Sequence, residues 1–164
     1  MFKYALAVLT VVSFACSVSP AAFAEGPFSI KSTSGSKTKD TKKAKEEAEY
    51  HFQEAEKFRT GKKYKEAIAE YHKAINSFPN DQIFYKNLGG TYALNNQLPE
   101  AEDTLRKGTK LAPKDWLMWN NLAVVYLETN RLDDADRAVT SAEKAGYHVP
   151  PGLKDEIKKR RSGK

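Results

Sequence analysis

The side chains that could perform acid–base or metal chemistry are three histidines and several neighbouring acids. His51, His72 and His148 lie far apart, and none stands in the HExxH spacing that places two metal ligands on one helical face. Glu102 and Asp103 are adjacent, so spacing alone leaves them open as an acid–base pair. Acids beside helical alanines are ordinarily solvated, however. We therefore predict no enzyme activity, no metal site and no cofactor.

The first residues have the layout of a secretory signal peptide. An apolar run at residues 4–15 follows a basic residue, and an A-x-A cleavage pattern stands at residues 22–24. The run is shorter than the roughly 20 apolar residues that a membrane-spanning helix needs. We predict a signal peptide at residues 1–24, cleavage after Ala24, and a periplasmic or secreted protein. An uncleaved anchoring helix and a lipoprotein modified at Cys16, the one cysteine, are the alternatives.

The positive charge is confined to the flanks of the chain. Although the whole chain carries +6, residues 48–149 contain 14 basic and 15 acidic side chains. Residues 25–40 are rich in Ser, Thr, Gly and Lys, which is typical of a flexible polar linker. Because no basic excess falls on the central segment, we predict no nucleic-acid partner. The basic residues between Lys154 and Arg161 leave open a weak attraction to an anionic membrane.

Most of the chain repeats with a period of 34 residues. An alanine, a ring 16 residues before it and a proline 12 residues after it recur in columns. The alanine column is Ala67, Ala101 and Ala135, the ring column is His51, Tyr85 and Trp119, and the proline column is Pro79, Pro113 and, in its place, Tyr147. A period between about 20 and 50 residues predicts stacked repeats rather than one globular core.

These columns resemble the tetratricopeptide repeat (TPR), a helix–turn–helix unit with the pattern W-x₂-L-G-x₂-Y, then A-x₃-F, then P. The second copy matches best, and the first departs most, with Glu54 in place of the leucine. The resemblance implies an all-α fold, a right-handed α-solenoid of three TPR helical hairpins. We place these repeats within residues 41–149, at about 48–81, 82–115 and 116–149, and predict a capping helix and basic tail at 150–164. Gly61, the Asn95-Asn96 pair and Asn130 are the predicted hairpin turns.

In TPR proteins the first helix of each copy lines a concave groove that holds a peptide, and the resemblance transfers this role to matching positions. The predicted groove residues are Phe52, Arg59, Ile83, Lys86, Gly90, Asn120, Val124 and Leu127. The same lines also contain Ala93, Leu94 and Leu117. Ile83, Leu117 and Leu127 have an alternative role in packing against neighbouring helices. Only Lys86 and Asn121 match the cluster with which some family members grip a peptide C-terminus, so capture of a terminal carboxylate is not expected.

We thus predict a non-enzymatic adaptor or scaffold whose groove binds a peptide or protein segment outside the cytoplasm. One alternative is a structural subunit of an envelope assembly that packs through its convex face or solenoid ends. Another is weak binding of an anionic surface through the basic tail. We expect a monomer, with a dimer as the alternative.

Overall fold

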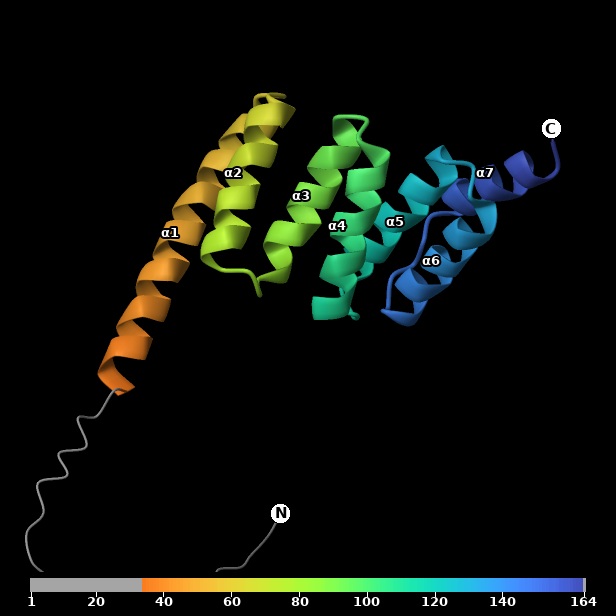
Figure 1. Cartoon of the computed structure of the whole chain (residues 1–164). Helices are drawn as coiled ribbons and strands as arrows, with labels where there is room; N and C mark the ends of the chain where they lie inside the picture. The colour runs from red at the N-terminus through yellow and green to blue at the C-terminus, as the bar shows by residue number, and fades with distance from the viewer. Residues whose placement is uncertain (1–33, 164) are drawn as a thin grey trace, which may run out of the picture. The chain divides into compact units, whose positions relative to one another are not determined.

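A computed structural model describes residues 34–163, which form seven α-helices and no strand within that range (Figure 1). The helices are α1 (Ser34–Thr60), α2 (Tyr64–Ser77), α3 (Gln82–Leu94), α4 (Leu98–Leu111), α5 (Trp116–Glu128), α6 (Leu132–Lys144) and α7 (Pro151–Arg161). None of these helices is long and apolar enough to cross a membrane. The predicted signal peptide, its cleavage site after Ala24 and Cys16 lie outside the described residues, as do residues 25–33 of the predicted linker.

The helices pair as hairpins that stack in chain order. The closest pairs are α1 with α2, α3 with α4, and α5 with α6, and each hairpin packs on the next through α2 and α3 or α4 and α5 (Figure 1). The final helix, α7, packs on α6. The prediction of an all-α solenoid of helical hairpins is therefore confirmed.

Small residues bring the paired helices together. Ala67, Ala101 and Ala135, the alanine column, are completely buried. At Gly89 on α3 a Cβ atom would lie only 2.5 Å from Leu105 Cγ on α4, so this position has no room for a side chain. The leucines and rings of the other columns then fill the space beside these contacts, which is how a repeat buries apolar surface without a central core.

Each hairpin turn contains one residue in the left-handed conformation, at the same position of the repeat. Lys62, Asn96 and Asn130 have φ angles of 59°, 59° and 56°, and they are spaced by the 34-residue period. The predicted turns at Asn96 and Asn130 are confirmed. In the first copy the left-handed residue is Lys62 rather than Gly61, because the turn keeps its register within the repeat and Gly61 stands one position earlier.

In the second and third copies, the residue of the ring column forms a hydrogen bond to the loop before its own helix. Tyr85 Oη donates to the Pro79 carbonyl oxygen and Trp119 Nε1 donates to that of Pro113, both at 2.9 Å. His51 makes a different contact, with its Nδ1 2.7 Å from a carboxylate oxygen of Glu70 on α2. The histidine therefore joins the two helices of the first hairpin.

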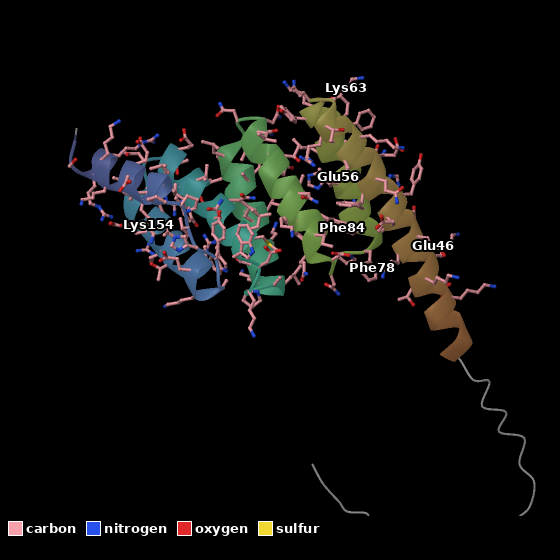
Figure 2. The ribbon with its side chains drawn as sticks, turned by 180° about the vertical axis from the view of Figure 1, so that it is seen from behind. Glu46, Glu56, Lys63, Phe78, Phe84 and Lys154 are labelled. Atoms are coloured by element: carbon pink, nitrogen blue, oxygen red, sulfur yellow. The ribbon has the colours of Figure 1, made fainter. Side chains whose placement is uncertain are left out.

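A second apolar cluster joins the first hairpin to α3. Phe84 of α3 packs with Ala48 and Phe52 of α1, and Phe78, in the loop between α2 and α3, lies against the same cluster (Figure 2). Helix α1 extends well before this cluster. It begins at Ser34, so residues 34–40 of the predicted linker are helical. Lysine, alanine and glutamate dominate the sequence from residue 42, and their high helix propensity allows the helix to continue without tertiary packing.

Helix α7 caps the last hairpin, as predicted. Most of the buried apolar residues from Ala55 of α1 to Ile157 of α7 form one cluster, which we call the main core cluster. Ile157 is 1% exposed within it, and Leu153 packs against it. Arg160 donates from Nη1 to the Leu127 carbonyl oxygen at 2.7 Å, which adds a charged donor to a carbonyl near the end of α5 that also accepts from the Asn130 N–H. Arg160 thus ties α7 to α5.

Candidate functional site

The first helices of the three hairpins form a groove of about 430 Å³. One residue comes from the last turn of α1, five come from α3 and three from α5. They are Arg59, Lys86, Asn87, Gly90, Ala93, Leu94, Leu117, Asn121 and Val124. Positions spaced by three or four residues lie on one helical face, which is why both α3 and α5 present a continuous wall.

Four of the predicted groove residues lie together in this groove, namely Arg59, Lys86, Gly90 and Val124. Ala93, Leu94 and Leu117, which the same helical lines contain, also line it. Leu94 and Val124 are 58% and 41% exposed, so their aliphatic side chains are available to a ligand.

The other four predicted residues are placed differently. Leu127 is buried, 5% exposed, in the main core cluster, and Phe52 packs its ring against Tyr71 and Phe84. Neither side chain lines the groove. Ile83 is exposed and Asn120 half-buried on α3 and α5, but the groove lining does not include them.

Asn87 was missed in the sequence, although it stands 34 residues before Asn121. The period itself was therefore the signal that could have found it. Neither side-chain amide forms a hydrogen bond to another described residue, so both keep a donor and an acceptor for a ligand. A pair of free amides between aliphatic side chains suits the alternating donors and acceptors of an extended peptide backbone.

Lys86 is ion-paired inside the groove. Its Nζ lies 2.9 Å from Asp115 Oδ2, and the two side chains are 24% and 17% exposed. The other oxygen of Asp115 accepts from the backbone N–H of Leu117 at 3.0 Å and caps α5. The Asp115 carboxylate thus caps the N-terminus of α5 and binds the lysine of α3. This double contact links the α3 and α5 walls of the groove.

Arg59 is also held from within. Its guanidinium forms hydrogen bonds of 2.5 and 3.2 Å to Glu56, and the Tyr71 hydroxyl donates to the same carboxylate. Burial alone would raise the pKa of Glu56, but the bonds from Arg59 and Tyr71 outweigh it and lower the pKa below its usual value. Burial and the adjacent Glu56 raise the pKa of Tyr71. The pair therefore places a fixed cation at the edge of the groove.

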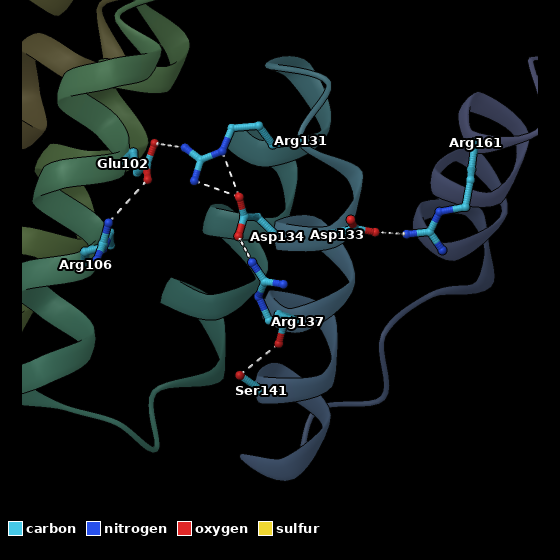
Figure 3. A network of polar contacts seen from close by, with 8 residues as sticks. All are labelled: Glu102, Arg106, Arg131, Asp133, Asp134, Arg137, Ser141 and Arg161. Carbon is cyan, nitrogen blue, oxygen red and sulfur yellow. Dashed lines mark hydrogen bonds and ion pairs between the residues drawn. The ribbon is translucent and has the colours of Figure 1, made fainter.

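Away from the groove, charged side chains form a network between the second and third hairpins (Figure 3). Arg131 joins Glu102 of α4, at 2.6 Å, to Asp134 of α6, at 2.7 Å. Asp134 also binds Arg137, and these two arginines lower its pKa. Glu102 is therefore a largely buried partner in an interhelical network rather than the solvated acid that its place beside a helical alanine predicted.

The basic tail is largely engaged by acids of the solenoid. Arg161 lies 2.8 Å from Asp133 and 2.7 Å from Asp136, and Lys154 pairs with Glu143. No group of three or more metal-ligating side chains gathers within residues 34–163. Two of the three histidines bind other side chains: His51 contacts Glu70, and His72 Nε2 lies 2.6 Å from the Tyr92 hydroxyl.

Two family models, both of the tetratricopeptide repeat, match residues 60–120 and 96–146. The chain belongs to the tetratricopeptide repeat family. Together the two matches cover α2 and the second and third hairpins, and so include α3 and α5, which build most of the groove. A comparison with curated proteins finds no match.

Solved TPR domains have the same fold. The Arabidopsis OM64 TPR domain superposes with a TM-score of 0.68 at 15% identity, covering 71% of this chain and 98% of that one. The Sgt2 TPR domain from Aspergillus fumigatus gives 0.63 at 20% identity, covering 71% and 78%. The TPR2B domain of yeast Sti1, solved in a pHsp70 complex, gives 0.64 at 19% identity, covering 72% and 98%. At these identities the similarity establishes the TPR solenoid fold.

Proposed function

We propose that this TPR protein is a non-enzymatic adaptor that binds an extended segment of another protein in the groove of α1, α3 and α5. The observation that carries the proposal is the composition of the groove. Exposed Leu94 and Val124 lie beside two amides, Asn87 and Asn121, that have no hydrogen-bond partner within residues 34–163. Aliphatic walls with a few placed polar groups are typical of peptide-binding sites.

The structural neighbours support a protein ligand. The first TPR of Spaghetti (RPAP3) was solved bound to the HSP90 peptide SRMEEVD, and it has a TM-score of 0.65 at 16% identity, covering 73% of this chain and 94% of that one. The Sti1 domain was likewise solved in a complex with pHsp70. Peptide binding by those domains favours the same class of ligand here, while the groove's own side chains select the sequence.

The location of the adaptor is a second part of the proposal. The signal-like residues 1–24 support export, so the mature protein would begin at Glu25 in the periplasm or the surrounding medium. Amino-terminal sequencing of the protein recovered from cell fractions tests this directly. A cytosolic protein that keeps Met1 would contradict export, and a lipid on Cys16 would indicate a membrane-anchored form.

The groove is tested by comparing two substitutions of exposed apolar residues. Val124→Asp places a charge in the groove, whereas Tyr50→Asp changes a 61% exposed ring on α1 outside the groove. We expect Val124→Asp to lose the partners that the wild type captures from cell extract and Tyr50→Asp to retain them. Circular dichroism establishes that both variants are folded. Equal capture by both variants would contradict groove binding and favour packing through another face.

A further inference from the structure

A second pocket continues the groove at the start of α3 and α5. It has a volume of about 620 Å³ and shares two residues, Lys86 and Leu117, with the groove already described. The remaining residues are Gln82, residues 112–115 of the turn between α4 and α5, and Trp116 at the start of α5. Because Lys86 and Leu117 line both hollows, the two lie next to each other along α3, and we call them together the trough. We call this second hollow the Trp116 pocket.

Trp116 gives the pocket an exposed aromatic surface. The residue is 37% exposed, and its ring stacks on Tyr147 with a centroid distance of 3.8 Å and an interplanar angle of 11°. Tyr147 stands in the proline column, so its departure from the repeat pattern supplies the ring that supports Trp116. An exposed tryptophan held in one orientation is typical of the residues that dominate binding energy at interfaces, because little side-chain entropy is lost on binding.

The charge of the trough is positive although the repeats as a whole are slightly acidic. Its lining contains three basic residues, Arg59, Lys86 and Lys114, and a single acid, Asp115. Lys86 is already paired with Asp115, and Arg59 is paired with Glu56 of α1. Lys114 forms no ion pair with a described residue, so its charge is uncompensated beside Trp116. The trough therefore favours an acidic ligand.

The length of the trough limits how many residues of a bound peptide it can contact. Gln82 lines one end and Leu94 the other, which corresponds to about 18 Å along α3 at the usual helical rise. An extended chain covers this distance with about five or six residues. Apolar surface lies at both ends, formed by Trp116 at one and by Leu94 and Val124 at the other.

We propose that the trough recognises an acidic, extended segment of about six residues whose apolar side chains lie on Trp116 at one end and between Leu94 and Val124 at the other. Lys114 attracts the acid next to the first apolar residue. This inference rests on the proposed function, and it names the class of partner and adds Trp116 and Lys114 to the site. A small apolar ligand or a basic segment is the competing occupant.

The test is selection from a displayed library of random peptides, in which each peptide is flanked by linkers at both ends. The wild-type protein should select peptides in which Asp or Glu neighbours an aromatic or aliphatic residue. Lys114→Glu should reverse the charge preference toward Lys and Arg, and Trp116→Ala should weaken the selected peptides about tenfold. Lys65→Glu, the same charge change on α2 outside the trough, should leave selection unchanged.

The outcomes separate this inference from the proposed function. Selected peptides that show no acidic preference, or that bind Lys114→Glu and Trp116→Ala as tightly as the wild type, overturn the inference. If Val124→Asp still abolishes their binding, the groove proposal stands. If no peptide is selected, or if Val124→Asp binds as the wild type does, both proposals fail. If Trp116→Ala loses its fold, the Lys114→Glu result decides between the outcomes, because the exposed Lys114 side chain forms no hydrogen bond or ion pair within the described residues.

Discussion

Lys86 of α3 and Asp115, the residue that caps α5, form an ion pair of 2.9 Å across the boundary between the second and third hairpins. The pair is mostly shielded from water and lies where the groove joins the Trp116 pocket. It therefore links solenoid geometry to ligand binding. A ligand carboxylate that approaches Lys86 meets a cation that already has a partner, which leaves Lys114 as the freer anion contact.

The first prediction concerns this ion pair. Asp115→Asn keeps a cap for α5 but removes the charge that holds Lys86, whereas Asp81→Asn makes the same change at the cap of α3. We expect Asp115→Asn to lower the free energy of unfolding by about 0.5–1 kcal/mol more than Asp81→Asn, since both retain a side-chain acceptor. Urea unfolding measures the difference. Equal costs would mean that the ion pair contributes nothing to stability.

The two adjacent glycines of α3 should respond oppositely to alanine. A Cβ on Gly89 would lie 2.5 Å from Leu105 Cγ, so Gly89→Ala should destabilise the protein by about 1–3 kcal/mol. At Gly90 the nearest atom is Asn121 Nδ2, at 3.8 Å. Gly90→Ala should therefore stabilise the helix by about 0.5–1 kcal/mol. Thermal unfolding gives both values, and a stable Gly89→Ala protein would show that α3 and α4 are less closely packed.

Acid should weaken the first hairpin through Glu56. Its pKa is lowered in the folded state, so the stability it contributes is fully present above its usual value of 4.5 and is lost as the pH falls through the folded-state pKa. We expect Glu56→Gln to be less stable than the wild type at neutral pH and to lose less stability on acidification. Glu49→Gln, an exposed change on the same helix, should follow the wild-type pH profile. Parallel profiles for Glu56→Gln and the wild type would refute this role.

The capping helix should stabilise the solenoid without forming the groove. Ile157 is 1% exposed, and Ile157→Ala should cost about 2–4 kcal/mol of unfolding free energy. Lys158→Ala, an exposed change on the same helix, serves as the control and should have little effect. Calorimetry distinguishes them. If Ile157→Ala unfolds at the wild-type temperature, α7 does not cap the core.

The repeat pattern predicted the helices because the residue type in each column follows from how the helices pack. Ala101 must be small where two helices meet, and the spacing of rings and prolines marks where helices begin and end. The capping helix was predicted as well, but the burial of Leu127 was not. Leu127 belongs to the same core cluster as Ile157 of α7, so this predicted groove residue is part of the core.

The groove was less predictable because its residues are free to vary between copies. Phe52 occupies the same column as Lys86, but its apolar ring turns toward Tyr71 and Phe84 and joins the core. Lys86 pairs with Asp115 at the other end of the same repeat, and the first copy has Phe52 in the lysine position, so no repeated column indicates this pair. Stacking of Tyr147 on Trp116 likewise depends on a residue that departs from the pattern.

The most direct test of groove binding is to observe the two asparagine side chains as ligand is added. A ¹⁵N–¹H correlation spectrum of the protein, titrated with the tightest peptide from the random library, reports their NH₂ signals separately from the backbone. We predict saturable shifts of the Asn87 and Asn121 side-chain signals and of the Gly90 amide, which all line the groove. Unchanged signals at these positions, with shifts instead around Arg106 and Ser141 in the hollow between α4, α5 and α6, would contradict the account.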